Sequence, residues 1–462
     1  MASLKKLPAN KPTISKKASL PQQLQAFLVD VFLSENIVNP RLLLAYSGGL
    51  DSSVLLHLLY QVNKTLPFQL TAQHVHHGLS ANAGAWADFC VASCKQLNVP
   101  LSISTVKVEN SGLGIEAAAR AARYQALQQS EADFMLLAHH QDDQAETFLL
   151  QLSRGAGVKG LAGMAAANSA WPRFMLRPLL DAPRKALLEY AKQHRLTWIE
   201  DESNADTKFD RNFMRHDILP ALAKKYPAIR QTISRSAQHM AEANGLLDEI
   251  AEQDMQSCLK EKTINLQMLK QLSQARINNA LRWWLLQNDC NLPSSAQLQQ
   301  ITQQIFTAKT DAMVKIKVSD SHTLQRYRNC AFLQKNMETV PTINLLWQGE
   351  DIIDLPDGTS LVFTQSLGQG FAIQRVPNIK LRVQYRQGGE RFRPDLGRPS
   401  RSLKTVLQTC EIPPWQRAQL PLIFMDEILV IIPNLGADCL VDASYQAKPS
   451  EMGLMVDWYL NM

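Results

Sequence analysis

Between residues 40 and 160, short apolar runs alternate with longer segments of helical periodicity. Strand-like runs occupy 41–46, 68–75, 100–108 and 134–139, and helical patterns lie between them around 52–62, 83–97 and 115–129. Because strands that alternate with helices build βαβ units, this order predicts a mostly parallel sheet covered on both faces. Sheets of this kind bind their ligands at the carboxyl ends of the strands.

The 462 residues of the chain are too many for a single core, so several domains are expected. After Pro220 helical patterns replace the strand patterns, and short β patterns return from residue 316 onward. The predicted class is α/β: a Rossmann-like parallel-sheet domain, then a helical domain and a small C-terminal α+β or β-rich domain. The expected boundaries are a basic flexible tail at 1–22, the α/β domain at 23–222, a mainly helical domain at 223–335, a connecting segment at 336–379 and a C-terminal domain at 380–462.

Basic residues are concentrated in two stretches of a chain whose formal net charge is +6. Five lysines precede the first acidic residue, Asp30, and seven basic residues crowd the stretch 382–404. Such clusters favour a polyanionic partner, and nucleic acid over membrane because no amphipathic basic helix accompanies them. For the N-terminal lysines alone, a solvated tail is the better interpretation.

Cysteine usage and the lack of long apolar runs indicate the compartment. The seven cysteines are scattered without the short paired spacing of zinc or redox motifs, which is typical of a reducing cytoplasm. The N-terminus has no apolar signal-peptide core, and no uninterrupted apolar run approaches ~18 residues. We therefore expect a cytoplasmic protein without a membrane partner.

The string "AYSGGLDSS", residues 45–53, stands where the first predicted strand meets the first predicted helix. Unpaired backbone N–H groups, the positive helix end and the hydroxyls of Ser47 and Ser52 form a cradle for phosphate, which Gly48 and Gly49 allow to approach closely. A tight turn capped by serine is the alternative, but the position of the whole string favours nucleotide binding. The chain has neither a Walker GK[ST] ending nor a G-x-G-x-x-G after a strand, which argues against a phosphoryl-transferring P-loop and a dinucleotide site.

"SGGLDS" resembles the pyrophosphate loop (PP-loop) of the N-type ATP pyrophosphatases, which cleave ATP between the α and β phosphates and adenylylate an acceptor oxygen. The resemblance implies a Rossmann-like PP-loop domain with ATP as cofactor and Mg²⁺ to offset the charge of the leaving pyrophosphate. It assigns ATP binding to Ser47, Gly48, Gly49, Leu50, Asp51 and Ser52, with a catalytic role for Asp51.

Further stretches narrow the resemblance to the bacterial tRNA(Ile)-lysidine synthase family. They are "HVHHGLS" at 74–80, "GIEAAARAARYQAL" at 114–127, "LAHHQDDQAETFLLQLSRGAGVKGLAGM" at 137–164, "RPLL…R" with "WIEDESNADTKFDRNFMRHDILPAL" at 177–222 and the basic stretch 388–424. This family joins lysine to the wobble cytidine of the CAU anticodon of tRNA(Ile). The resemblance thus implies L-lysine and this tRNA as partners, and a homodimer is one open arrangement. It also implies an adenylylated cytidine, with pyrophosphate and AMP released.

Two carboxylates, Asp143 and Glu146, lie three residues apart on one face of a predicted helix. Carboxylates in this position suit an ammonium ligand, and the resemblance assigns the pair to lysine recognition, with a catalytic role for Asp143. A solvated acidic first turn, favoured by the helix dipole, is the alternative. Asp142 points elsewhere and is expected to cap the helix.

Arginines at two further places match the family pattern. Arg120 is expected near the reaction centre, where an always-charged clamp suits phosphate, and Arg123 is open between catalysis and structural pairing. Arg211 and Arg215 match R-N-x-x-R and are candidates for binding RNA or nucleotide phosphate. Their alternative is a hinge network with Asp201, Asp206 and Asp210. The candidates for tRNA contact in the C-terminal domain are Arg391, Arg393 and Lys404.

Histidines yield no firm assignment from the sequence. His139 and His140 stand at a strand end, suited to nucleotide contact or proton transfer but equally to a structural role. A zinc site at 74–77 is disfavoured because alternate strand residues point to opposite faces and no cysteine is near. His76 and Ser80 replace the aspartate and arginine usual in the family, so no family role is carried over for them.

Three other functions compete with this prediction. A PP-loop tRNA thiolation enzyme needs catalytic cysteines, and this region has only Cys90 and Cys94 in a C-x-x-x-C helical pattern. A small-molecule adenylylating amidotransferase would leave the basic C-terminal stretch idle, and nothing resembles a glutaminase domain. A non-catalytic RNA-binding protein would not need intact "SGGLDS" and "DDQAET" strings.

Overall fold

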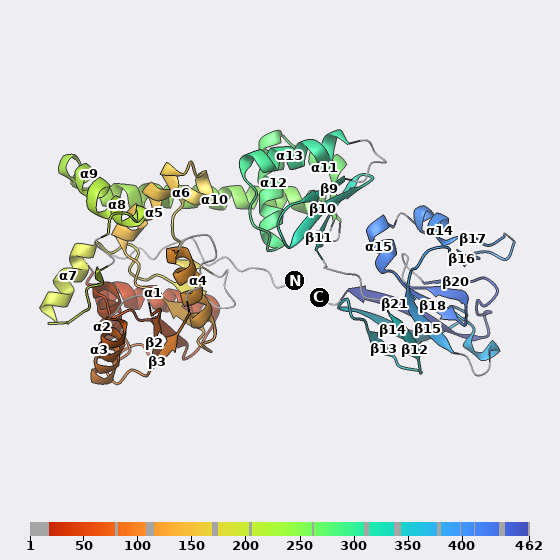
Figure 1. Ribbon diagram of the computed structural model, residues 1–462, viewed down its shortest axis with the longest axis horizontal. Coiled ribbons are helices and arrows are strands. Elements are labelled where there is room, and N and C mark those ends of the chain that lie inside the picture. Colours follow the sequence, from red (N-terminus) through yellow and green to blue (C-terminus); the bar gives the residue numbers. More distant parts are fainter. Residues whose placement is uncertain are drawn as a thin grey trace. The chain divides into compact units, whose positions relative to one another are not determined.

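The computed structural model (Figure 1) describes residues 18–78, 82–107, 115–168, 174–202, 206–260, 263–308, 314–336, 343–376, 380–397, 399–410, 412–433 and 439–460. Ser80, Arg398 and the N-terminal lysines therefore lie outside the described residues. The chain divides into two compact units, 1–250 and 251–462.

A six-stranded sheet in the order β3-β2-β1-β4-β6-β5 forms the centre of unit 1. Its strands are β1 (Arg41–Ala45), β2 (Gln69–His76), β3 (Leu101–Thr105), β4 (Phe134–Leu136), β5 (Ala167–Asn168) and β6 (Phe174–Leu176). All neighbours pair in parallel except β5 with β6, which confirms the predicted parallel sheet. The strand order reverses direction at β1, and open α/β sheets bind ligands at such a point.

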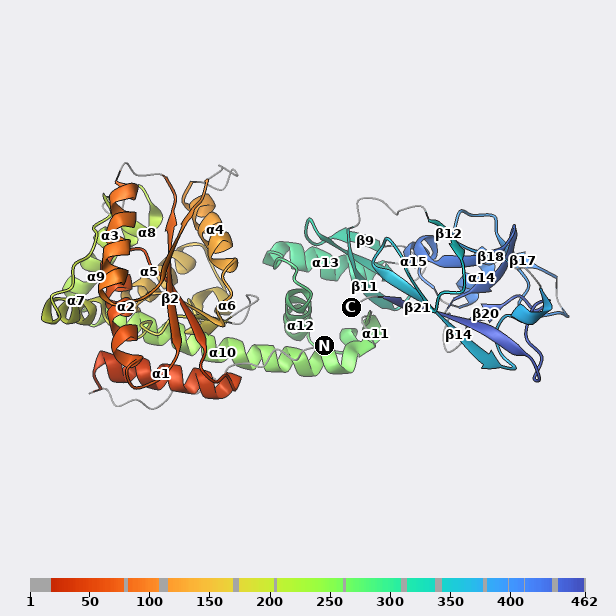
Figure 2. The ribbon, with the colours of Figure 1, turned by 90° about the horizontal axis from the view of Figure 1, so that it is seen from below.

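Helices cover both faces of this sheet, with α2 and α3 on one side and α4 on the other (Figure 2). The helices of unit 1 are α1 (Leu20–Glu35), α2 (Leu50–Val62), α3 (Ala83–Gln96), α4 (Ile115–Gln128), α5 (Gln141–Ser153), α6 (Val158–Leu161), α7 (Arg184–Gln193), α8 (Asp210–Phe213), the π-helix η2 (Met214–Ile218) and α9 (Leu219–Lys225). The helix α10 (Ile229–Cys258) starts in this unit and ends in unit 2. No helix of the described residues is long and apolar enough to span a membrane.

The expected tail at 1–22 is too long, because α1 already begins at Leu20. The backbone N–H of Ser19 donates to the Gln22 side chain over 2.9 Å, so a residue counted in the tail caps the helix. Leu24 and Leu28 are then buried in the main core with leucines of α2. The N-terminal helix is therefore part of the α/β domain.

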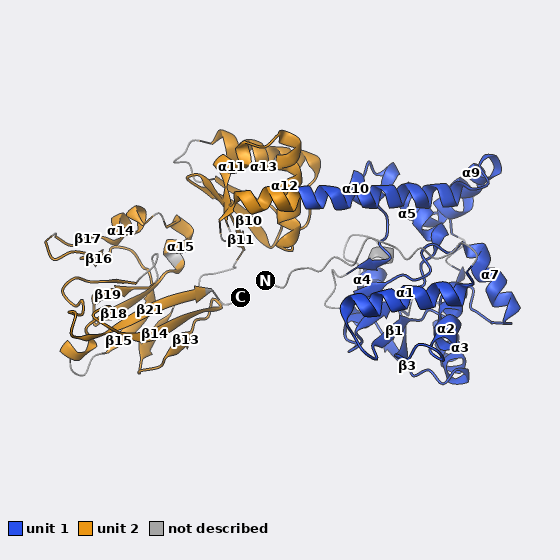
Figure 3. Ribbon diagram, turned by 180° about the vertical axis from the view of Figure 1, so that it is seen from behind, with its two compact units in different colours: residues 1–250 blue, residues 251–462 orange. Residues whose placement is uncertain are grey.

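The first part of unit 2 combines helices with a five-stranded antiparallel sheet (Figure 3). Its helices are α11 (Leu266–Lys270), α12 (Gln274–Gln287) and α13 (Ser295–Thr307), and its sheet order is β7-β8-β11-β10-β9. The strands are β7 (Leu259–Lys260), β8 (Thr263–Asn265), β9 (Val314–Lys317), β10 (His322–Tyr327) and β11 (Cys330–Lys335). The helical region is present as predicted, but strands also precede residue 316.

The C-terminal part is sheet-rich, as expected, and begins earlier than residue 380. Its strands are β12 (Asn344–Trp347), β13 (Ile352–Asp354), β14 (Thr359–Leu367), β15 (Leu381–Tyr385), β16 (Arg391–Phe392), β17 (Arg401–Ser402), β18 (Pro421–Met425), β19 (Ile428–Ile432), β20 (Leu440–Val441) and β21 (Met452–Leu460). Its helices are η3 (Ile373–Arg375), α14 (Leu403–Thr409) and α15 (Pro414–Gln419). Because β12 pairs with β15 and β14 with β21, the expected connecting segment 336–379 is wrong for 343–367: these residues belong to the C-terminal sheets.

Candidate functional site

The predicted phosphate loop joins the carboxyl end of β1 to the start of α2. Gly48 has φ +80°, a conformation that favours glycine. A Cβ at this position would lie 2.7 Å from Ile199 Cδ1 and 3.0 Å from Cys90 Sγ. Gly49 caps α2 with φ −73° and forms a parallel bridge with Ile199. Both the turn and its packing therefore require glycine at 48.

Serine hydroxyls hold the loop in this shape. Ser47 Oγ and Ser52 Oγ are 3.0 Å apart, and Ser52 Oγ donates to the Gly49 carbonyl over 3.0 Å. Ser47 is exposed, whereas the Leu50 side chain is buried in the core. Of the predicted ATP residues, Leu50 therefore has only its backbone to offer a ligand, and Ser47 has a reachable hydroxyl.

Asp51 lies in the first turn of α2 with its two carboxylate oxygens in different surroundings. Oδ2 is 3.4 Å from His140 Nε2. Oδ1 is buried and has no hydrogen-bond partner among the described residues. A buried acceptor without a donor is costly, and a carboxylate oxygen at an anion-binding helix end suits Mg²⁺ held together with ATP phosphates. The residues present thus fit the expected metal–nucleotide group.

His140 connects Asp51 to the predicted lysine carboxylates. It caps α5, is 1% exposed, and its Nδ1 lies 3.4 Å from Asp143 Oδ2. Its backbone N–H donates to the same oxygen over 2.9 Å. Burial disfavours the charged imidazole, but the hydrogen bond to Asp51 and the charge of Asp143 outweigh it and raise the pKa of His140. Asp142, expected to cap this helix, does not do so.

Asp143 and Glu146 lie beside Arg211 and Arg215, a grouping that we call the acid–arginine cluster. Arg211 donates from Nη2 to Asp143 Oδ1 and from Nε to Glu146 Oε2, each over 2.8 Å. Arg215 donates from Nε to Glu146 Oε1 over 2.6 Å and lies 3.3 Å from Asp143 Oδ1. Burial raises the pKa of Asp143, but the charges of His140 and Arg211 lower it overall. The two carboxylates are buried rather than solvated, against the alternative weighed for them.

Within the described residues, the arginines of the R-N-x-x-R motif pair with Asp143 and Glu146, while Asn212 Nδ2 donates to the Asp206 carbonyl over 2.9 Å. Asp210 pairs instead with Arg154, at 3.2 Å, and Asp206 accepts from the Lys208 backbone. The motif spans the end of α8 and the π-helix η2, and both of these elements pack on α5. π-Helical turns are rare and frequent at functional sites. This one places Arg215 against Glu146.

Asp142 anchors neighbouring helices to α5 instead of capping it. One of its oxygens is 2.6 Å from Arg230 Nε at the start of α10. The other accepts from the backbone N–H of Arg184, the first residue of α7, over 3.1 Å. The two adjacent aspartates of "DDQAET" thus point to different partners, as the sequence indicated, but with a structural role for Asp142.

Arg120 and Arg123 extend from α4 near the carboxyl ends of β2 and β4. Arg120 Nη2 donates to Tyr124 Oη over 3.3 Å, and its guanidinium carbon lies 5.1 Å from the centre of the Tyr124 ring. Arg123 Nε donates to His77 Nε2 over 3.1 Å. His139, at the end of β4, has a lowered pKa because of burial and the charges of Arg177, Arg211 and Arg120, which outweigh the attraction of Asp143. Arg177, the first residue of the "RPLL" string, lies directly after β6, and sequence reasoning gave it no role of its own.

His77 should make the protein less stable in mild acid. Burial, and secondly the charge of Arg123, lower its pKa to about 4, whereas an unfolded histidine titrates near ~6.5. Between these values the unfolded chain binds the extra proton, so stability falls as the pH drops from about 6.5 to about 4. For His77→Gln, which keeps an acceptor for Arg123, we expect a smaller fall, by on the order of 2 kcal/mol. Thermal unfolding across this range tests this, and parallel curves for the two proteins would contradict it.

The three tRNA candidates of unit 2 fall on neighbouring elements of the C-terminal part. Arg391 is on β16 and Lys404 on α14, both exposed, and α14 packs against β16 and β17. The Arg391 side chain donates to Ser400 Oγ over 3.0 Å. Arg393 follows β16 and is half-buried, with its backbone N–H donating to Asp442. Arg391 and Lys404 therefore present charge to solvent.

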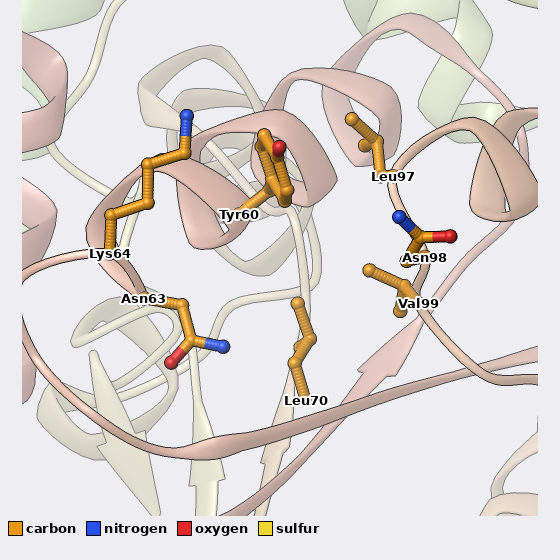
Figure 4. Close-up of a pocket in the computed structure, with 7 residues that line it drawn as sticks. All are labelled: Tyr60, Asn63, Lys64, Leu70, Leu97, Asn98 and Val99. Carbon is orange, nitrogen blue, oxygen red and sulfur yellow. The ribbon is translucent and has the colours of Figure 1, made fainter.

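A surface pocket of 220 Å³ lies away from all of these groups, between α2, β2 and the turn after α3 (Figure 4). Its lining includes Tyr60, Lys64 and Leu97 but none of the predicted site residues. We therefore assign the site from the strand ends and not from this pocket. Within the described ranges, no group of three or more His, Cys, Asp or Glu residues is placed to hold a metal ion.

Comparison with known proteins gives matches along most of the chain. Family models match at residues 18–222 (PP-loop domain), 265–332 (TilS substrate binding domain) and 381–458 (TilS substrate C-terminal domain). The tRNA(Ile)-lysidine synthase of Nitrosomonas europaea is 42% identical over 91% of this chain and 92% of its own. Proteins of the same name from Serratia proteamaculans (41% identical; 84% and 89% of the two chains) and Coxiella burnetii (36%; 95% and 96%) are also similar.

Proposed function

The chain belongs to the tRNA(Ile)-lysidine synthase family, and on that premise we propose that it is an ATP-dependent ligase that joins lysine to the wobble cytidine of the CAU anticodon of tRNA(Ile). Pyrophosphate and AMP are the other products, and the cytoplasm is where this substrate is found. The observation that carries the proposal is the contact chain from Asp51 through His140 to Asp143. It joins the phosphate loop to the acid–arginine cluster, so one site serves both half-reactions.

In the first half-reaction the cytidine carbonyl oxygen attacks the α-phosphorus of ATP, and the bond to the β-phosphate oxygen breaks. The loop residues Ser47–Gly49 and the start of α2 bind the departing pyrophosphate through backbone N–H groups and hydroxyls. Asp51 would hold Mg²⁺, which supplies charge neutralisation when bound. Arg120 stabilises negative charge on the transferred phosphate.

In the second half-reaction the lysine amine attacks the activated ring carbon and AMP leaves. The acid–arginine cluster offers an amino acid both signs of charge: Asp143 and Glu146 suit an ammonium group, and Arg211 or Arg215 suits a carboxylate. The arginines already pair with the acids. A bound lysine would therefore replace an arginine as the partner of these carboxylates. The buried carboxylates support lysine over a neutral amino acid.

The proposed tRNA surface lies in unit 2. Exposed Arg391 and Lys404, with Arg393 beside them, would contact RNA phosphates, which contribute affinity but no sequence information. Such contacts weaken as salt is raised. The substrate-domain matches at 265–332 and 381–458 support this placement.

A single assay separates this function from its rivals. Purified protein is supplied with ATP, labelled lysine and unmodified tRNA bearing a CAU anticodon, and label in RNA, AMP and pyrophosphate are followed. We expect lysine label only in this tRNA, with AMP and pyrophosphate formed in equal amounts. Sulfur transfer to tRNA would indicate a thiolation enzyme, and pyrophosphate release with a small acceptor but no RNA would indicate an amidotransferase. Either result would overturn the proposal.

A further inference from the structure

Arg177 is a buried guanidinium that forms no ion pair with a carboxylate among the described residues. It is 7% exposed and follows β6 at the carboxyl end of the sheet. Its Nη1 donates to the Ala165 carbonyl over 2.7 Å, and its Nη2 lies 2.9 Å from Met175 Sδ. Its Nε is buried with no partner among the described residues. A buried cation without a carboxylate is costly, so this one calls for an explanation.

Arg120, which carries the same sign of charge, acts on Arg177. Burial and the charge of Arg120 lower the pKa of Arg177, whereas the neighbouring Tyr124 side chain raises it. The same charge lowers the pKa of Arg123, after burial and against Asp201. Arg120 thus repels two other guanidinium groups beside the site, and an anion bound by Arg120 would relieve this repulsion.

Tyr124 stands between two of these cations. Arg120 donates to its hydroxyl over 3.3 Å and lies over its ring, and the tyrosine is close enough to Arg177 to raise the pKa of that guanidinium. Arg120 is itself exposed, and an exposed arginine has many rotamers, whereas one held by a hydroxyl and an aromatic face has few. The half-buried Tyr124 therefore restrains the exposed guanidinium of Arg120.

We propose that Tyr124 and Arg177 are positioning residues that hold Arg120 as a preorganised clamp for one phosphate group. Arg177 holds the Tyr124 side chain in place, and Tyr124 holds Arg120. Of the three residues, only Arg120 contacts the anion. The inference rests on the proposed function and extends it. The phosphate belongs either to the nucleotide or to the RNA backbone next to the target base, and the two sources share the same recognition chemistry.

A double-mutant cycle on the adenylylation step tests the positioning roles. The rate of transfer of label from α-labelled ATP to tRNA is measured in single turnover without lysine. We expect Tyr124→Phe, which keeps the ring, to lower this rate about tenfold in the native chain and less than about twofold in an Arg120→Ala background. Arg177→Lys should behave in the same way. If Tyr124→Phe has no effect, or lowers the rate equally in both backgrounds, the positioning role is wrong.

A matched control is available on the same fold. Tyr60 also has a cation over its ring, Lys64 Nζ at 4.5 Å from the ring centre, but it lines the distant pocket (Figure 4). Tyr60→Phe should leave the rate within about twofold. A loss of rate equal to that of Tyr124→Phe would show that removing a tyrosine hydroxyl far from the site slows adenylylation just as much. That result would overturn the inference.

Binding measurements with Arg120→Ala identify the source of the phosphate. Affinities for a non-hydrolysable ATP analogue and for the tRNA are measured separately. About tenfold weaker binding of one, with the other unchanged, assigns the clamp to the nucleotide or to the RNA. Unchanged affinity for both overturns the clamp. If Arg120→Ala also leaves the adenylylation rate unchanged, the role of Arg120 in the proposed function is wrong as well. The rate and the two affinities therefore distinguish a failure of the clamp from a failure of that role.

Discussion

Asp143→Asn should reduce lysine transfer to tRNA about 100-fold while the affinity for ATP changes less than about threefold. The substitution keeps the shape of the side chain and removes the charge that an ammonium group needs. Truncating one partner of a buried charge pair costs about 2–5 kcal/mol, and 2.7 kcal/mol corresponds to a factor of 100. Arg211 and Arg215 keep their bonds to Glu146, so the fold should survive.

The adjacent Asp142 supplies the control for this prediction. Asp142→Asn removes the same charge from the same helix turn, but this residue pairs with Arg230 at 2.6 Å and not with the acid–arginine cluster. Lysine kinetics, ATP affinity and the thermal midpoint are measured for both variants. Asp142→Asn should cost stability and leave the lysine KM nearly unchanged. Equal loss of lysine and ATP use by Asp143→Asn would count against a lysine site.

The parallel sheet was predictable from sequence because its strands are continuous apolar runs. Leu42, Leu43 and Leu44 are all buried, as a strand covered by helices on both faces requires. The sheet of 259–335 lacks this signal at its start, since β7 and β8 have two and three residues. Strands so short show no alternation that a pattern can detect, so that region was expected to be mainly helical.

The phosphate loop was predictable for a similar reason: its parts are contiguous. The acid–arginine cluster is different, because Arg211 and Arg215 lie 65 to 72 residues from the acids they bind. Local sequence offered nearer aspartates, such as Asp210, as partners. Only the packing of α8 and η2 on α5 decides between them. Sequence therefore identified both halves of the cluster without indicating that they meet.

Arg177 begins the family-like string "RPLL", but sequence reasoning assigned it no role of its own because its character depends on its surroundings. A single arginine after a three-residue strand is ordinary in sequence, and only burial beside Arg120 makes it unusual. An arginine immediately after a buried parallel strand is the pattern that would have identified it, since this position faces the ligand end of the sheet. Charged residues at every strand end should therefore be weighed together in such folds.

Gly48→Ala should both destabilise the protein and abolish ATP-dependent activity. An alanine at φ +80° costs about 1–2 kcal/mol, and a Cβ 2.7 Å from Ile199 Cδ1 adds about 1–3 kcal/mol of overpacking. The expected sum of about 2–5 kcal/mol lowers the thermal midpoint by roughly 5–15 °C. Displacing the loop should lower tRNA adenylylation at least about 100-fold. Differential scanning calorimetry and the adenylylation assay measure the two effects.

Gly49→Ala and a compensating change separate strain from crowding in this prediction. At Gly49 φ is −73° and the nearest atoms to an added Cβ are 3.6 Å and 3.9 Å away, so this alanine should cost less than about 1 kcal/mol. Adding Ile199→Ala to Gly48→Ala removes the clash but not the strained φ. In an Ile199→Ala background, Gly48→Ala should therefore cost less stability than in the native chain, by the amount that crowding contributes. Full recovery would show that the backbone tolerates alanine. No recovery would show that the Ile199 side chain already moves away from the added Cβ, so that the positive φ alone disfavours alanine.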